Sequence, residues 1–290
     1  MTEAAGGPSR ESPLQAVLSV LTTLGPPLTI ATALMIYFGW ARSDTQAREM
    51  GLDVSLFGFS AQDYIMNSIS SLYLPLLVIA GLTLGGLAVH RRVDAALRRP
   101  EARPVLRTSA LVALIGGLVA IAAAVVLAAV LRSGVQLFAP LVVAIGTVVA
   151  AYGGWLRNAA AAAAPEVLPV WHRALRMLLI GAVVTAALFW AVSDYATIVG
   201  RGYALQIQAG VSQLPRVTAI STTSLGVQGP GVTETPVVQG GKVLYYRTTG
   251  LRLLAGSGGR MFLLHDGWTP RHGTVIVLPD SDQIRWQFSR

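Results

Sequence analysis

Few residues in this chain have the types and spacing that catalysis or metal binding requires. His265 and Asp266 are neighbours, and His272 lies close behind them in the sequence. A metal ion needs three or four converging ligands, and we expect no metal site because this part of the chain offers so few. Serine residues are plentiful, but none lies in a GxSxG motif, where a serine nucleophile would be expected. The sequence contains no cysteine, which excludes disulfides and thiolate chemistry.

The glycine-rich segment AGSGGR, at residues 255–260, is the other candidate for chemistry. It lacks the GxxxxGK[ST] spacing of a phosphate-binding loop, and it joins two apolar segments instead of opening a helix. A hairpin turn explains the glycines. We therefore expect a protein that is not an enzyme and that carries no cofactor.

The composition of the chain is that of a membrane protein. Hydrophobic residues make up 53% of the sequence and charged residues 12%, whereas soluble domains typically carry about 25% charged residues. The net charge of +8 is compatible with nucleic-acid binding. However, the arginines cluster at the ends of apolar segments, as the topology signals of membrane proteins do. We expect no nucleic-acid partner.

Five apolar segments are long enough to cross a bilayer as helices. We place these spans at about residues 14–40, 65–89, 109–131, 135–156 and 176–195, after a disordered tail at 1–13. Gly25, Pro26 and Pro27 predict a kink or a break in the first span. If that span does not cross fully, four remain. None of the spans carries a charged residue near its middle, which argues against an ion-coupled transporter.

The connector at residues 89–107 carries an unusual excess of positive charge. Only Asp94 and Glu101 oppose its six arginines. We call these the connector arginines: Arg91, Arg92, Arg98, Arg99, Arg103 and Arg107. Positive connectors stay in the cytoplasm, and a second basic connector lies at 157–176. We therefore predict an inner (plasma) membrane protein with its N-terminus inside and residues 200–290 outside. The same arginines can also bind the headgroups of membrane lipids.

A polar stripe lies at the start of the second span. The sequence SAQD at residues 60–63 is a capping pattern that begins a helix, and we expect that helix to run into the span without interruption. Asp63, Asn67 and Ser71 then recur every four residues on one helix face. Two interpretations fit this stripe: the mouth of a pore, or the wet side of a helix that protrudes above the bilayer. We favour the wet side.

Small residues recur at helical spacing in three spans. They are Gly81 and Gly85 in the second span, Gly116, Ala120 and Ala124 in the third, and Gly146, Ala150 and Gly154 in the fourth. Small side chains let helices approach closely in lipid. We expect contacts within the chain first, and contacts between copies in a homo-oligomer second.

Residues 200–290 are rich in turns and in residues that favour strands. We expect strands at about 217–222, 242–249, 251–255, 260–265, 274–278 and 283–288. The segment LRLLAGSGGRMFLL reads as a hairpin, and residues 224–241 as a long loop or an edge hairpin. The fold class is thus an α-helical polytopic membrane protein with a small C-terminal all-β domain, built as a barrel or a compact sheet.

Three stretches resemble segments of a known type of protein. Residues 35–76 resemble the first external loop of uncharacterised multi-pass membrane proteins of high-GC bacteria. Residues 250–268 and 275–288 resemble the C-terminal tails of the same proteins. The resemblance implies a membrane location, and it brings no activity and no functional residue with it.

Two functions fit these observations. The first is a non-enzymatic membrane protein whose outer β-domain binds or senses a protein partner or an envelope component. The second is an oligomeric ion channel in which Asp63, Asn67 and Ser71 ring the outer mouth.

Overall fold

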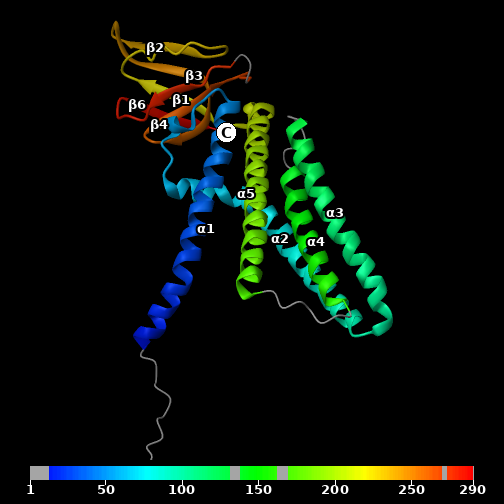
Figure 1. Cartoon of the computed structure of the whole chain (residues 1–290). Helices are drawn as coiled ribbons and strands as arrows, with labels where there is room; N and C mark the ends of the chain where they lie inside the picture. The colour runs from blue at the N-terminus through cyan, green and yellow to red at the C-terminus, as the bar shows by residue number, and fades with distance from the viewer. Residues whose placement is uncertain (1–12, 131–137, 162–168, 270–272, 290) are drawn as a thin grey trace, which may run out of the picture.

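The computed structural model describes residues 13–130, 138–161, 169–269 and 273–289. Five long helices in these residues support a six-stranded sheet (Figure 1). The helices are α1 (Pro13–Glu49), α2 (Ala61–Leu97), α3 (Arg103–Val130), α4 (Phe138–Ala159) and α5 (Val170–Ala209). Four of them, α2 to α5, are long and apolar enough to span a membrane.

The first helix is continuous. α1 is helical from Pro13 to Glu49, so the chain does not break at Gly25, Pro26 and Pro27, and the alternative of a kink there stays a prediction. Apolar helices tolerate proline because neighbouring groups and small local adjustments satisfy the freed backbone. The span expected at 14–40 stays a prediction, since the side chains of residues 13–26 lie outside the described part of the chain.

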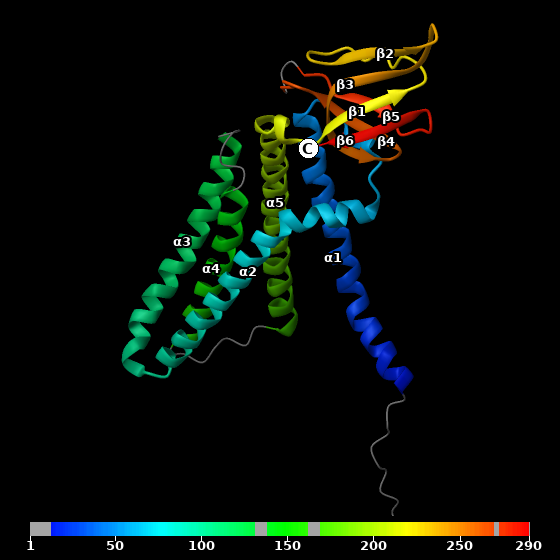
Figure 2. The ribbon, with the colours of Figure 1, turned by 180° about the vertical axis from the view of Figure 1, so that it is seen from behind.

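Four helices stand side by side in the order α1, α5, α4, α3, and α2 crosses them diagonally (Figures 1 and 2). The sheet lies at one end of this array. The α2–α3 connection and the starts of α1 and α5 lie at the other end. α5 has 40 residues and α1 has 37, so they are roughly 60 and 55 Å long. Both helices are longer than the hydrocarbon thickness of a bilayer, about 30 Å. A part of each helix would therefore extend beyond a bilayer and support the sheet.

α2 is one continuous helix with a bend. Its start follows the predicted capping box: the Ser60 backbone N–H donates to the Asp63 carboxylate at 2.8 Å, and the Ser60 hydroxyl accepts from the Asp63 N–H. Pro75 lies inside the helix, where it removes the donor for the Ser71 carbonyl and bends the axis. The first turns of α2 therefore run across α1 and α5 before the helix turns towards the opposite end (Figure 2).

The strands form one antiparallel sheet in the order β5-β4-β3-β1-β6, with β2 also paired to β3. They are β1 (Arg216–Ser221), β2 (Thr233–Gln239), β3 (Lys242–Ser257), β4 (Arg260–His265), β5 (Ile276–Pro279) and β6 (Ile284–Ser289). The two strands expected at 242–249 and 251–255 are thus a single long strand, β3. α5 continues to Ala209, beyond the domain boundary predicted at residue 200.

The barrel alternative is wrong and the compact sheet is confirmed. β5 and β6 occupy opposite edges, and no ladder joins them, so the sheet is open. It nevertheless curls, because side chains of both edge strands, Ile276 and Trp286 among them, pack on one core of Val217, Leu251 and Leu263. The short connection between β5 and β6 keeps the two edges close at one end.

Two glycine pairs make the hairpin turns. Gly258 and Gly259 join β3 to β4 with φ of +58° and +69°, and Gly240 and Gly241 join β2 to β3 with φ of +60° and +78°. Two-residue turns with positive φ at both positions match the twist of antiparallel strands. The predicted glycine-rich hairpin is confirmed. Residues 224–241 were expected to form a long loop or an edge hairpin, and they contain β2 and the turn of an edge hairpin.

The other face of the sheet packs on the helix ends. Leu264 and Trp268 are buried against Met50 of the α1 end and Ala204 of α5. Phe262 stacks on Phe57, with ring centroids 4.2 Å apart. Because β4 is covered on both faces, its last four residues are all buried instead of alternating. The sheet and the ends of α1 and α5 therefore share one apolar core.

Candidate functional site

Three helices meet directly beneath the sheet. We call this region the helix junction; it comprises residues 37–49 of α1, 61–71 of α2 and 189–204 of α5. The junction connects the sheet to the helices that are apolar enough for a membrane.

Two glycines allow the helices of the junction to touch through their backbones. A methyl group on Gly39 of α1 would overlap the carbonyl oxygen of Tyr64 in α2 and lie 2.6 Å from its carbonyl carbon. A methyl group on Gly200 of α5 would overlap the carbonyl oxygen of Arg42 in α1. Only a residue without a side chain fits at either crossing.

Arg42 contacts all three helices of the junction. It extends from α1, and its Nη1 donates to the Asn67 carbonyl oxygen of α2 at 3.2 Å. Its guanidinium carbon lies 4.2 Å from the ring centroid of Tyr203 in α5. Burial lowers the pKa of Arg42, while Tyr203 acts to raise it, and an arginine stays charged at neutral pH. Such a cation–π contact contributes about 0.5–2 kcal/mol.

The three polar residues predicted to form one stripe do not share one exposed face. Asp63 is exposed and caps its own helix. Asn67 is half-buried, and its Nδ2 donates to the Ser43 hydroxyl of α1 at 3.2 Å. Ser71 is fully buried in the junction. The bend in α2 turns this side of the helix towards α1 and α5, so the three residues do not form one exposed stripe within one chain. A pore mouth built from several copies stays a prediction.

Further contacts hold α1 against α5. The hydroxyls of Tyr37 and Ser193 lie 3.2 Å apart, and the Tyr37 ring lies 4.9 Å from the ring of Phe189. Closer to the sheet, the Arg201 Nε donates to Glu49 at 2.8 Å. The contact between these two helices thus continues along the whole junction.

A second arginine, this one buried, fastens the sheet to the end of α5. Arg252 of β3 is only 5% exposed. Its Nη1 donates to the carbonyl oxygens of Ser212 and Leu214, each at 2.8 Å, and its Nε pairs with the Asp266 carboxylate at 2.7 Å. Ser212 lies in the short helix η3 (Val211–Gln213) that follows α5. Arg252 therefore ties that connection to the centre of the sheet.

The β2–β3 hairpin presents apolar side chains beyond the rest of the sheet. Val238 is 56% exposed, and Val243 and Leu244 are exposed to a similar degree. Figure 1 shows this hairpin reaching away from the helices. The hairpin is therefore an exposed apolar part of the sheet.

The side chains of His265 and Asp266, the candidates for chemistry, are engaged in separate contacts. His265 is buried, and its Nδ1 lies 3.0 Å from the Asp266 backbone oxygen. The Asp266 carboxylate forms an ion pair with Arg252. His272 lies outside the described residues. Within the described ranges, no three histidine or acidic side chains gather where a metal ion would need them.

Small residues bring α3 and α4 together, partly at positions other than those predicted. A methyl group on Gly117 would lie 2.6 Å from the Gly146 carbonyl oxygen, and one on Gly153 would lie 2.7 Å from the Ala110 carbonyl oxygen. Ala124 and Ala150 are buried as well, and Ala120 is half-buried. Gly154 faces the Arg176 side chain of α5.

The remaining small residues are not at a close helix contact among the described residues. Added methyl groups on Gly81, Gly85 and Gly116 would meet nothing within 4 Å. Gly117, the next residue in the sequence, takes the contact expected of Gly116. A repeat of small residues does not reveal which of two adjacent glycines faces the partner helix.

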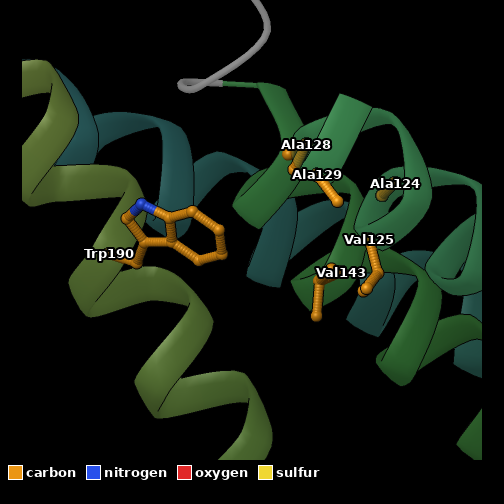
Figure 3. Close-up of a pocket in the computed structure, with 7 residues that line it drawn as sticks. Ala124, Val125, Ala128, Ala129, Val143 and Trp190 are labelled. Atoms are coloured by element: carbon orange, nitrogen blue, oxygen red, sulfur yellow. The ribbon is translucent and has the colours of Figure 1, made fainter. Parts of the chain in front are cut away.

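An apolar hollow lies between α5 and the α3–α4 pair. It encloses about 350 Å³. Figure 3 shows Trp190 of α5 facing Val143 of α4 and the alanines of α3 across it. Nothing polar among its lining side chains points to a reaction.

The connector arginines lie at the end of the array opposite the sheet. All six side chains are exposed, in the last turns of α2, in η2 (Pro100–Ala102) with its flanking residues, and at the start of α3. The structure thus separates two groups of polar residues, one at the helix junction and one at this end.

Comparisons with protein-family models, with curated protein sequences and with solved structures found no match for the chain. The resemblance of residues 35–76, 250–268 and 275–288 to membrane proteins of high-GC bacteria therefore stays a prediction.

Proposed function

We propose that the protein is a non-enzymatic integral membrane protein whose outer sheet binds a protein partner or an envelope component and communicates that binding to its membrane helices. The observation that carries the proposal is the continuous core between the sheet and the ends of α1 and α5, in which Leu264 and Trp268 pack on Met50 and Ala204. A flexibly tethered domain has no means of moving the helices. A domain built onto helix ends does.

The orientation of the proposal follows from charge. The connector arginines lie at the end opposite the sheet, and so do the end of α4 with Arg157 and the start of α5 with Arg173 and Arg176. By the positive-inside rule this end faces the cytoplasm, so the sheet faces outwards from the inner membrane. The exposed β2–β3 hairpin would then extend furthest from the bilayer.

A photo-crosslinking amino acid at Leu244 of the full-length chain in cells tests the binding function. Leu244 lies near the tip of the exposed hairpin, and Gln283, in the exposed turn between β5 and β6, is a matched control. We expect a discrete adduct from Leu244 that the control does not give. The adduct should weaken when Val243 is replaced by Ser. Equal adduct patterns at both positions would contradict the proposal.

An oligomeric channel is the second candidate, because the most apolar window of α2 has no buried residue within the chain. Gly81 and Gly85 of this helix are also free to contact another copy. Purified protein in planar bilayers distinguishes the two functions. Currents that disappear with Gly85→Leu would favour the channel, and silence at all voltages together with a monomeric mass would remove it.

A further inference from the structure

The helix ends opposite the sheet carry positive charge that the described carboxylates leave largely unpaired. Arg157 of α4 and Arg173 and Arg176 of α5 join the connector arginines there. We call these residues together the arginine end. Among the described residues, its only ion pair is Arg98 with Asp94 at 3.3 Å, and these side chains are 81% and 53% exposed.

Some arginines near the sheet are paired more closely. Arg48, Arg201 and Arg252 each pair with a carboxylate at 2.7–2.8 Å, whereas Arg216 and Arg285 have no ion pair among the described residues. The arginine end differs in the number of its arginines: nine exposed arginines face only two described carboxylates there, Asp94 and Glu101. This excess of positive charge is open to an anionic ligand.

A cluster of aromatic side chains lies at the arginine end, around the last turns of α4. The Tyr152 hydroxyl lies 3.3 Å from His90 Nδ1 of α2, and the Trp155 ring lies 5.2 Å from the His90 ring. On another side of α4, the Arg176 guanidinium from α5 fills the space left by Gly154, where an added methyl group would lie 2.8 Å from its Nη2. The arginine and the aromatic cluster thus flank adjacent residues of α4.

We infer that this surface, made by α2, α4 and α5, binds the headgroup of an anionic phospholipid, with the exposed Arg176 guanidinium on the phosphate. A planar guanidinium matches phosphate oxygens with two parallel hydrogen bonds. Tyrosine and tryptophan prefer the level of the headgroups, where one part of the ring is wet and the other apolar. Tyr152 and the partly exposed Trp155 are placed for that level. A free phosphate ion would use the arginine but not the aromatic rings.

The inference rests on the membrane placement in the proposed function and not on what the sheet binds. A failure to find a partner at Leu244 therefore leaves it intact. If the sheet were found in the cytoplasm, the proposed orientation would be wrong. The lipid-binding inference would then be decided by the lipid-binding measurement alone.

The test is lipid binding to the purified full-length protein, counted by native mass spectrometry. The probes are phosphatidylglycerol and phosphatidylcholine with the same acyl chains. We expect phosphatidylglycerol to be retained at a defined stoichiometry when phosphatidylcholine is lost. Arg176→Gln should weaken this binding about fivefold, since a basic residue near an anionic surface contributes roughly that factor. Arg216→Gln, which removes an exposed arginine at the sheet end, should leave it unchanged.

Two further arms keep the result interpretable. Arg176→Lys retains the charge and should retain part of the preference, which separates lost binding from lost folding. Millimolar inorganic phosphate should not displace the lipid. The inference is overturned if the two lipids bind equally, if Arg216→Gln weakens binding as much as Arg176→Gln does, or if phosphate alone competes.

Discussion

Replacing Gly39 with alanine is the sharpest perturbation of the helix junction. The added methyl group would overlap the Tyr64 carbonyl oxygen and lie 2.6 Å from the carbonyl carbon. Both atoms belong to the backbone of α2, so no rotamer change relieves the overlap. The two helices must separate, and overpacking of this kind costs about 1–3 kcal/mol.

An alanine in an open helical position has the opposite effect. Added methyl groups on Gly81 in α2 and Gly181 in α5 would meet nothing within 4 Å. Alanine stabilises a helix interior by roughly 0.5–1 kcal/mol relative to glycine. We therefore expect Gly39→Ala to lower the thermal stability of the purified protein, and Gly81→Ala and Gly181→Ala to preserve or raise it.

Cross-linking gives a second readout of the same change. The chain has no native cysteine, so Ser43→Cys with Asn67→Cys introduces the only reactive pair, at side chains that lie 3.2 Å apart. A short thiol cross-linker should join them in the native background and react more slowly once Gly39→Ala is added. The reasoning is refuted if Gly39→Ala is as stable as the two control variants and cross-links at an unchanged rate.

Three other predictions follow from the same structure. Arg252→Met leaves the half-exposed Asp266 carboxylate and two carbonyl oxygens without their partner, so we expect a loss of about 1–3 kcal/mol and faster proteolysis within residues 210–289. Arg98→Gln, at an exposed pair, should cost less than about 1 kcal/mol. Pro75→Ala restores a donor for the Ser71 carbonyl, so spin labels at Met66 and Leu87 should move apart as α2 straightens; an unchanged distance would mean that tertiary contacts set the bend. Hydrogen bonds from Ser55 lower the pKa of Asp53. The stability that this carboxylate contributes is therefore present above about pH 4 and is lost as the pH falls through the lowered pKa. The melting temperatures of the unaltered chain and of Asp53→Asn should differ at pH 7 and converge well below pH 4.

The local elements were largely predictable from the sequence. The long apolar segments predict α2 to α5, because the signal for such helices is length and lack of charge. The Ser60 cap and the Gly258–Gly259 turn depend only on residues close in sequence, and both appear as expected. The order of the strands was not predictable, since the pairing of β1 with both β3 and β6 depends on contacts far apart in the chain.

The candidate site was much less predictable than the fold. Arg42 and Arg252 look like ordinary loop and strand arginines in the sequence, and only the folded chain brings them to Tyr203 and Asp266. Pro75 inside an apolar segment was a signal for the bend in α2 that our sequence interpretation did not use. Without that bend, Asp63, Asn67 and Ser71 look like one exposed stripe.

Thiol labelling in intact cells tests the central claim most directly, namely that the sheet faces outwards while the arginine end faces the cytoplasm. Single cysteines at Leu244, in the exposed hairpin, and at Arg99, among the connector arginines, are both at exposed positions of a cysteine-free chain. A membrane-impermeant maleimide should modify the cysteine at 244 in intact cells and the cysteine at 99 only after permeabilisation. The reverse pattern would contradict the orientation and, with it, an outer binding function for the sheet.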